Sequence, residues 1–233
     1  MTATLATDDL LSQRYTQRIL TRATLTLDAI TEPLNARSRR TRAALLAAAH
    51  AILKEHGFEA LTMTAVADRA GVTRRTLYKH FPTRGELIGS LFDYVAEREG
   101  LAESLETVWT APNAVAALDA WAEHLAGYHP RLLALDRAVQ RVWRSDPDAA
   151  AHRERVVAAK LTNCRRLARW LADEGRLANT WTTESAGEML FALISSDMIE
   201  ALIVDRRWSR RRLADRLAVL FRSTFVAGSG ERN

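Results

Sequence analysis

The residues best suited to chemistry are concentrated between positions 73 and 84. This segment combines basic, aromatic and hydroxyl side chains, namely Arg74, Arg75, Thr76, Tyr78, Lys79, His80 and Arg84. The planar guanidinium of arginine can hydrogen-bond O6 and N7 of a guanine together, and hydroxyl groups can donate to phosphate oxygens. These residue types therefore suit contact with a nucleic acid, provided that a helix presents them on one exposed face.

Two short helices joined by a glycine turn would present that face. Thr62 is a suitable N-cap for the first helix, and Gly71 permits the positive φ of a sharp turn. Thr73 caps the second helix, on which Leu77 and Phe81 would face the core and the basic residues the solvent. Capping threonines also leave N-terminal amides that can bind phosphate. The pattern predicts a helix-turn-helix.

A preceding helix over 39–56, ended by Gly57, would complete a three-helix module. Its predicted core positions are Ala43, Leu46, Ala47, Ala49, Ile52 and Leu53. After the module, Thr83 is predicted to cap a fourth helix that runs from Arg84 to about Trp109.

The net charge of +5 is unevenly distributed along the 233 residues. Residues 37–84 carry ten Lys and Arg against three acids, which gives +7, whereas residues 1–36 and 85–233 each carry −1. A charge run is often a solvated face, but this excess surrounds a glycine turn between two helices. The distribution therefore favours a polyanion-binding module attached to a near-neutral body.

The stretch LTMTAVADRAGVTRRTLYKHFPTRGEL resembles the DNA-binding signature of TetR/AcrR-family transcriptional regulators. The matching features are the Ala70-Gly71-Val72 turn, the Thr76-Leu77-Tyr78 run and His80-Phe81 before a capped helix. The resemblance is close over residues 38–90; elsewhere it extends only to length and helical character. It implies an all-α fold, with an N-terminal three-helix DNA-binding domain and a C-terminal helical domain for ligand binding and dimerisation.

The resemblance also implies roles for single residues in DNA binding. Base edges would be faced by Thr64, Arg74 and Arg75. Phosphates or groove edges would be contacted by Thr62, Thr76, Tyr78, Lys79, His80 and Arg84. Two residues depart from the common pattern: Arg75 replaces a small residue or proline, and Arg84 replaces a phosphate-binding lysine. Four arginines before or within the first helix either reach phosphate or a minor groove or are simply solvated: Arg37, Arg39, Arg40 and Arg42.

The rest of the chain is predicted to be helical. Prolines, a glycine and an Arg-Arg-Trp junction divide it into the spans 113–128, 131–144, 148–174, 184–206 and 210–226. We therefore divide the chain into an N-terminal extension (1–36), the DNA-binding domain (37–84), a ligand-binding and dimerisation domain (85–227) and a flexible tail (228–233). In the extension, Asp8 to Ile30 is predicted to be helical. It is either a surface helix with solvated arginines or an accessory helix that packs on the next domain with its arginines toward nucleic acid.

The body is rich in large aromatic residues, which either fill its core or line an apolar cavity with a few polar groups. The candidates for ligand binding are Trp109, Trp121, His124, Tyr128, Trp143, Trp170 and Phe191. His124, His129 and Cys164 match no spacing typical of a metal site, and neither a metal nor a cofactor is expected.

The last two predicted helices are the most apolar. The resemblance implies that they pair with their copies in a homodimer, and a two-fold dimer would also read two DNA half-sites. The predicted interface residues are Leu190, Ile194, Met198, Leu202, Leu213, Leu217 and Leu220.

These observations favour a ligand-responsive regulator, most simply a homodimeric repressor released from a palindromic operator on double-stranded DNA by a small apolar or aromatic effector. The alternative is a ligand-independent accessory protein that coats DNA or recruits a protein partner. An enzyme is not expected, because the sequence has no phosphate-binding glycine loop, metal-spaced cluster or nucleophile with an evident base. The single cysteine, the absence of an apolar span and the acidic N-terminus favour a cytoplasmic protein without membrane contact.

Overall fold

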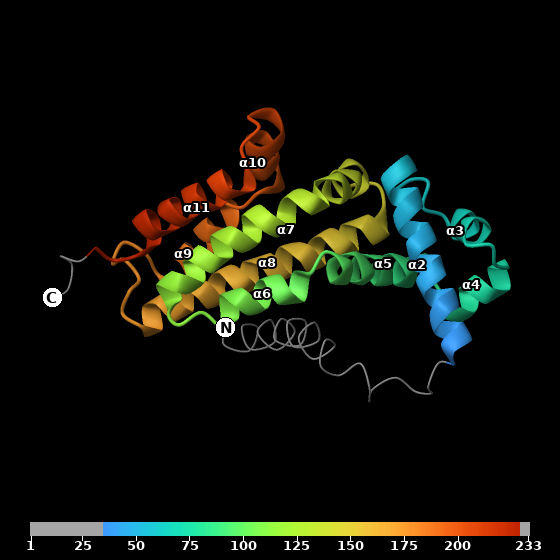
Figure 1. Ribbon diagram of the computed structural model, residues 1–233, viewed down its shortest axis with the longest axis horizontal. Coiled ribbons are helices and arrows are strands. Elements are labelled where there is room, and N and C mark those ends of the chain that lie inside the picture. Colours follow the sequence, from blue (N-terminus) through green and yellow to red (C-terminus); the bar gives the residue numbers. More distant parts are fainter. Residues whose placement is uncertain (1–34, 229–233) are drawn as a thin grey trace. The chain divides into compact units, whose positions relative to one another are not determined.

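The computed structural model describes residues 35–228, which form helices together with an isolated β-bridge between Leu177 and Val226 (Figure 1). The described residues divide into two compact units. The head unit comprises residues 35–99 and 134–155, and the body unit comprises residues 100–133 and 156–228. The predicted N-terminal helix and most of the C-terminal tail lie outside the described residues.

The head unit contains four complete helices: α2 (Ala36–His56), α3 (Met63–Arg69), α4 (Arg74–His80) and α5 (Arg84–Arg98). The predicted threonine caps are confirmed, because Thr62, Thr73 and Thr83 accept hydrogen bonds from Ala65 N, Thr76 N and Glu86 N at 3.1, 3.2 and 3.1 Å. Gly71 has φ 66° in the turn between α3 and α4. The all-helical fold and the helix-turn-helix are therefore confirmed.

The core of the head unit differs from the prediction along α2. Ala43 and Ala47 are exposed, and the helix buries Leu45 and Ala48 instead, together with the expected Leu46, Ala49, Ile52 and Leu53. Alanines lie on both sides of α2, so the sequence did not show which face is buried. Leu45 has more apolar surface than an alanine, and its burial determines the buried face.

Two long helices take part in both units: α7 (Ala114–Val142) and α8 (Pro147–Asp173). The predicted break at Pro130 is wrong, because α7 continues through this proline. Proline removes one backbone hydrogen bond and can be tolerated where packing holds the flanking turns. His129 and Leu133, on either side of Pro130, are both buried.

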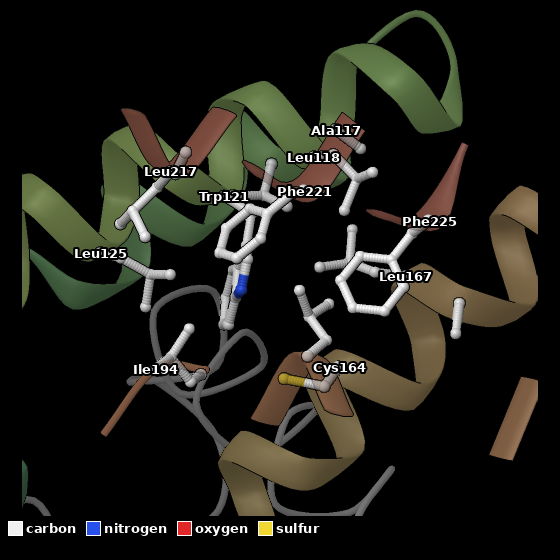
Figure 2. Close-up of a cluster of buried hydrophobic side chains, with 14 of the residues drawn as sticks. Ala117, Leu118, Trp121, Leu125, Cys164, Leu167, Ile194, Leu217, Phe221 and Phe225 are labelled. Carbon is white, nitrogen blue, oxygen red and sulfur yellow. The ribbon is translucent and has the colours of Figure 1, made fainter. Parts of the chain in front are cut away.

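The body unit also contains α6 (Leu101–Trp109), α9 (Thr183–Ala192), α10 (Ser196–Glu200), the short π-helix η1 (Ala201–Asp205) and α11 (Arg210–Phe225). Two predicted continuous helices are interrupted. Gly100, with φ 69°, separates α5 from α6, and Ser195 starts α10 by capping Met198 N. Figure 2 shows Trp121, Leu125, Cys164, Leu167, Leu217 and Phe221 converging in the core of this unit.

Candidate nucleic-acid interface and ligand site

Helix α4 presents the basic residues predicted to contact DNA. Leu77 is buried against the core, while Arg74, Arg75, Tyr78 and Lys79 are exposed. This arrangement follows from the helical period, since Leu77 and Phe81 are four residues apart and turn one side of α4 inward. The exposed side chains can therefore approach a ligand without disturbing the fold.

Arg74 is connected to the preceding helix. Its Nε donates to Thr64 Oγ1 at 3.1 Å, and its Nη2 donates to the same hydroxyl. Two of the three residues predicted to face base edges thus form a pair across the turn. Such a contact restricts the rotamers of the arginine and presents its remaining N–H groups in a defined direction.

Several other predicted DNA contacts also have partners within the head unit. Thr62 and Thr73 cap helices, and Thr76 Oγ1 lies 2.9 Å from Thr73 Oγ1. Burial lowers the pKa of His80, as do the nearby charges of Arg42 and Lys79, and this shift favours the neutral form of its ring.

The arginines at the start of α2 divide into two groups. Arg39 and Arg40 are exposed, and Arg40 Nε donates to Ala36 O at 3.3 Å. Arg42 is directed inward: it donates to His80 O at 3.3 Å and Ser90 Oγ at 3.0 Å. Arg42 therefore connects α2 with the end of α4 and with α5.

Arg84 is likewise engaged within the head unit. Its Nε donates to Leu61 O at 3.0 Å, and its other nitrogens form ion pairs with Asp148 at 2.7 Å and Asp146 at 3.0 Å. Its guanidinium also lies over the Phe58 ring, 5.1 Å from the centroid. Arg84, which replaces a phosphate-binding lysine of the family pattern, is therefore paired with two carboxylates in the protein without DNA.

In the body unit, α7 carries a column of aromatic rings. The ring centroids of Trp121 and His124 lie 5.0 Å apart, and those of His124 and Tyr128 lie 5.4 Å apart, in stacked orientations. His129 meets His124 edge-on at 5.9 Å. The structure therefore brings together three of the predicted ligand residues and adds His129.

Buried polar atoms accompany this column. Within the described part of the chain, Trp121 Nε1, His129 Nδ1 and Asn163 Oδ1 have no hydrogen-bond partner. A buried polar group without a partner costs about 1–3 kcal/mol, so these atoms favour occupancy by a ligand or water. Sequence reasoning did not select Asn163, although an amide beside the core residue Cys164 was an available signal.

Burial also sets the protonation of the two histidines. It lowers the pKa of His124 to about 4 and that of His129 well below the ordinary value, and the nearby charge of Lys160 acts in the same direction. His124 Nδ1 lies 2.8 Å from Ser104 Oγ, in a pair that sequence reasoning also missed. Both rings are therefore neutral donors and acceptors at pH 7.

The remaining predicted ligand residues do not form one site. Trp143 belongs to the head unit, where the guanidinium of Arg153 lies 4.3 Å from its ring centroid. Trp109 and Trp170 line one hollow of the body unit, and Phe191 is partly buried at the edge of the body core. A single pocket containing all seven residues is therefore not what the structure describes.

Most of the predicted interface residues pack inside their own chain. Leu190, Ile194, Leu213 and Leu217 belong to the body core and are at most 3% exposed, while Met198 and Leu202 are partly buried. The interface assignment of the four buried leucine and isoleucine side chains is corrected, because they offer no surface to a second copy. The exposed large apolar residues of this region are Met189, Val204, Val219 and Leu220.

The described residues contain no helix that combines the length and the apolar character needed to cross a membrane. No group of three His, Cys, Asp or Glu side chains within residues 35–228 is arranged to hold a metal ion.

Comparisons with known proteins agree with the helix-turn-helix. Residues 45–91 match the family described as "Bacterial regulatory proteins, tetR family". A 54-residue segment is 48% identical to the HTH-type transcriptional repressor KstR of Mycobacterium tuberculosis, and it covers 23% of this chain and 24% of KstR. The match thus spans about a quarter of that relative.

Solved structures share the fold over most of the chain. NalD, the secondary repressor of the MexAB-OprM multidrug efflux pump in Pseudomonas aeruginosa, is 21% identical, with a TM-score of 0.62 over 83% of this chain and 100% of NalD. A SmeT–triclosan complex is also 21% identical, with a TM-score of 0.63 over 82% of this chain and 93% of SmeT. KstR and NalD are both described as repressors. The segment of residues 45–91 thus matches the tetR family of bacterial regulatory proteins, and the fold of the chain is similar to that of NalD and SmeT.

Proposed function

We propose that the protein is a homodimeric transcriptional repressor that binds a palindromic operator through its head units and leaves it when a small apolar or aromatic effector binds the body unit. The observation that carries the proposal is the exposed basic face of α4 behind the glycine turn, in the segment that matches the family. A helix of this kind can lie in the major groove, where arginine recognises guanine.

The charge pattern of the C-terminal helices supports the homodimer. Residues 183–205 contain five acids and neither Lys nor Arg, whereas residues 206–216 contain six arginines and one aspartate. A two-fold axis brings the same surface of both copies together, so the acidic segment of one copy can meet the basic segment of the other. The exposed Val219 and Leu220 would provide the apolar part of this interface.

The effector response is supported by buried polar atoms of α7 and α8 that have no hydrogen-bond partner within the described residues. An effector shifts the protein between two conformations only by its difference in affinity for them. A ligand would supply hydrogen-bond partners for Trp121 Nε1, His129 Nδ1 and Asn163 Oδ1. These hydrogen bonds would raise the affinity of the ligand for the conformation in which they form.

The proposal is tested by selecting bound sequences from a random pool of double-stranded DNA at physiological salt, using the full chain. We expect a palindrome whose half-site centres lie about one helical turn apart. Affinity without a consensus that falls steeply with salt would instead indicate an accessory protein that coats DNA.

Matched variants test the reading face. Arg74→Ala should lose about 1–3 kcal/mol of discrimination between the selected site and a site mutated at the contacted base pair. Lys79→Ala should weaken binding to both sites equally. Unchanged discrimination in Arg74→Ala would exclude Arg74 from base recognition.

A further inference from the structure

A hollow of about 290 Å³ lies in the body unit where α6 and α8 end. It is lined by two tryptophans, two arginines and one aspartate, namely Trp109, Trp170, Arg166, Arg169 and Asp173. Its volume is near the lower limit of small-molecule sites, which are about 300–1,000 Å³. The hollow therefore has room for a compact molecule of one or two rings.

Arg166 provides a partly desolvated cation in this hollow. Its guanidinium lies over the indole of Trp109, 3.9 Å from the ring centroid. Although the side chain as a whole is exposed, burial of the guanidinium lowers the pKa of Arg166 below its ordinary value. Within residues 35–228, no carboxylate forms an ion pair with Arg166 or Arg169. A desolvated guanidinium of this kind favours an anionic partner.

The two tryptophans contribute apolar ring faces to the hollow, but their indole N–H groups differ in whether they have a hydrogen-bond acceptor. Trp170 Nε1 donates to Glu174 Oε1 at 2.7 Å, whereas Trp109 Nε1 is buried without an acceptor in the described chain. Indole faces bind planar rings by offset or edge-to-face contact. Asp173 offsets the charge of one of the two arginines, so the five lining residues carry a net charge of +1, which one carboxylate would neutralise.

We propose that this hollow binds a planar aromatic monocarboxylate, with its carboxylate on Arg166 and its ring against Trp109 and Trp170. The lining of this hollow includes none of Trp121, His129 and Asn163, so the inference goes beyond the proposed function. It rests on that function only for the step from binding to regulation.

The test compares 1-naphthoate with the neutral 1-naphthamide by isothermal titration of the full chain without DNA. The wild-type protein should bind the carboxylate on the order of tenfold more tightly than the amide, because a charge-assisted contact to arginine is lost in the amide. Arg166→Gln should remove this preference, and Arg176→Gln, at an exposed position outside the hollow, should retain it. Trp170→Leu should weaken the binding of both molecules.

Equal affinities for the two molecules, or a preference that persists in Arg166→Gln, would overturn the assignment of this site. Because binding is measured without DNA, either result leaves the operator selection unaffected. Conversely, a failed operator selection would leave a measured carboxylate preference in place, so the two proposals can fail separately.

Discussion

Arg84 and Asp148 form a close ion pair in the head unit, with Nη1 of the arginine 2.7 Å from Oδ2 of the aspartate. The same guanidinium binds Asp146 and donates to Leu61 O, which immediately precedes the N-cap of α3. One side chain therefore connects the turn before α8 with the start of the helix-turn-helix.

Arg84→Ala should lower the free energy of unfolding by about 1–3 kcal/mol, because two partly buried carboxylates and a carbonyl lose their donor. Urea denaturation measures this change. The control is Arg69→Ala, which removes an exposed pair with Glu55 and should lower the free energy of unfolding much less than Arg84→Ala does. Equal losses in the two variants would mean that the Arg84 network contributes no more than a surface pair.

Two helical glycines should respond oppositely to alanine. A Cβ on Gly187 would lie 2.9 Å from Arg165 Cα, a backbone atom that cannot move away easily, so Gly187→Ala should destabilise the protein by about 1–3 kcal/mol. A Cβ on Gly127 would meet nothing within 4 Å, and Gly127→Ala should stabilise α7 by about 0.8–1 kcal/mol. Thermal unfolding of both variants distinguishes the two cases; a stabilised Gly187→Ala would contradict the close approach of α8 and α9.

Stability should fall as the pH drops from 6.5 toward 4. The pKa of His124 is about 4 in the folded protein and 6.5 ordinarily, so the unfolded chain binds more protons between these values. Between pH 8 and pH 5, His124 alone should account for a loss of about 2 kcal/mol. Urea denaturation at both pH values measures it.

His124→Asn keeps a polar side chain near Ser104 but cannot titrate, so its loss of stability between pH 8 and pH 5 should be smaller by about 2 kcal/mol. The wild-type protein, measured in the same two buffers, is the reference. If His124→Asn kept the full pH dependence, another group would be responsible.

Leu220→Arg should dissociate the proposed homodimer, because it places a charge among exposed apolar residues on α11. Sedimentation velocity should then detect a monomer at micromolar concentration. Tyr78→Ser removes an exposed apolar side chain from the head unit and should leave the dimer intact. A Leu220→Arg protein that still sediments as a dimer would place the interface elsewhere.

Local signals were sufficient to predict much of the fold. The caps at Thr62, Thr73 and Thr83 were predictable because a cap and its amide are three residues apart. The continuation of α7 through Pro130 was not, since a local rule disfavours it and burial of the flanking residues outweighs that rule. The same limitation applies to Ala43 and Ala47, whose small side chains give no preference between the two faces of α2.

The arrangement of the candidate site residues depends on contacts between residues that are far apart in the sequence. The carboxylate partners of Arg84 are 62 and 64 residues away along the chain, so its engagement could not be predicted from the residues around it. The period of Leu213 and Leu217 correctly indicated an apolar face of α11. A periodic pattern does not tell whether such a face packs against its own chain or against a copy, and here the face belongs to the core of the same chain.

The discontinuous head unit limits how this protein can be re-engineered. Exchanging residues 35–99 with those of a relative would carry Arg84, Gly85 and Phe92 but leave behind their partners Asp146, Asp148 and His152. A chimaera designed to read a new operator should therefore receive residues 134–155 from the same donor, so that both segments of the unit keep their native contacts.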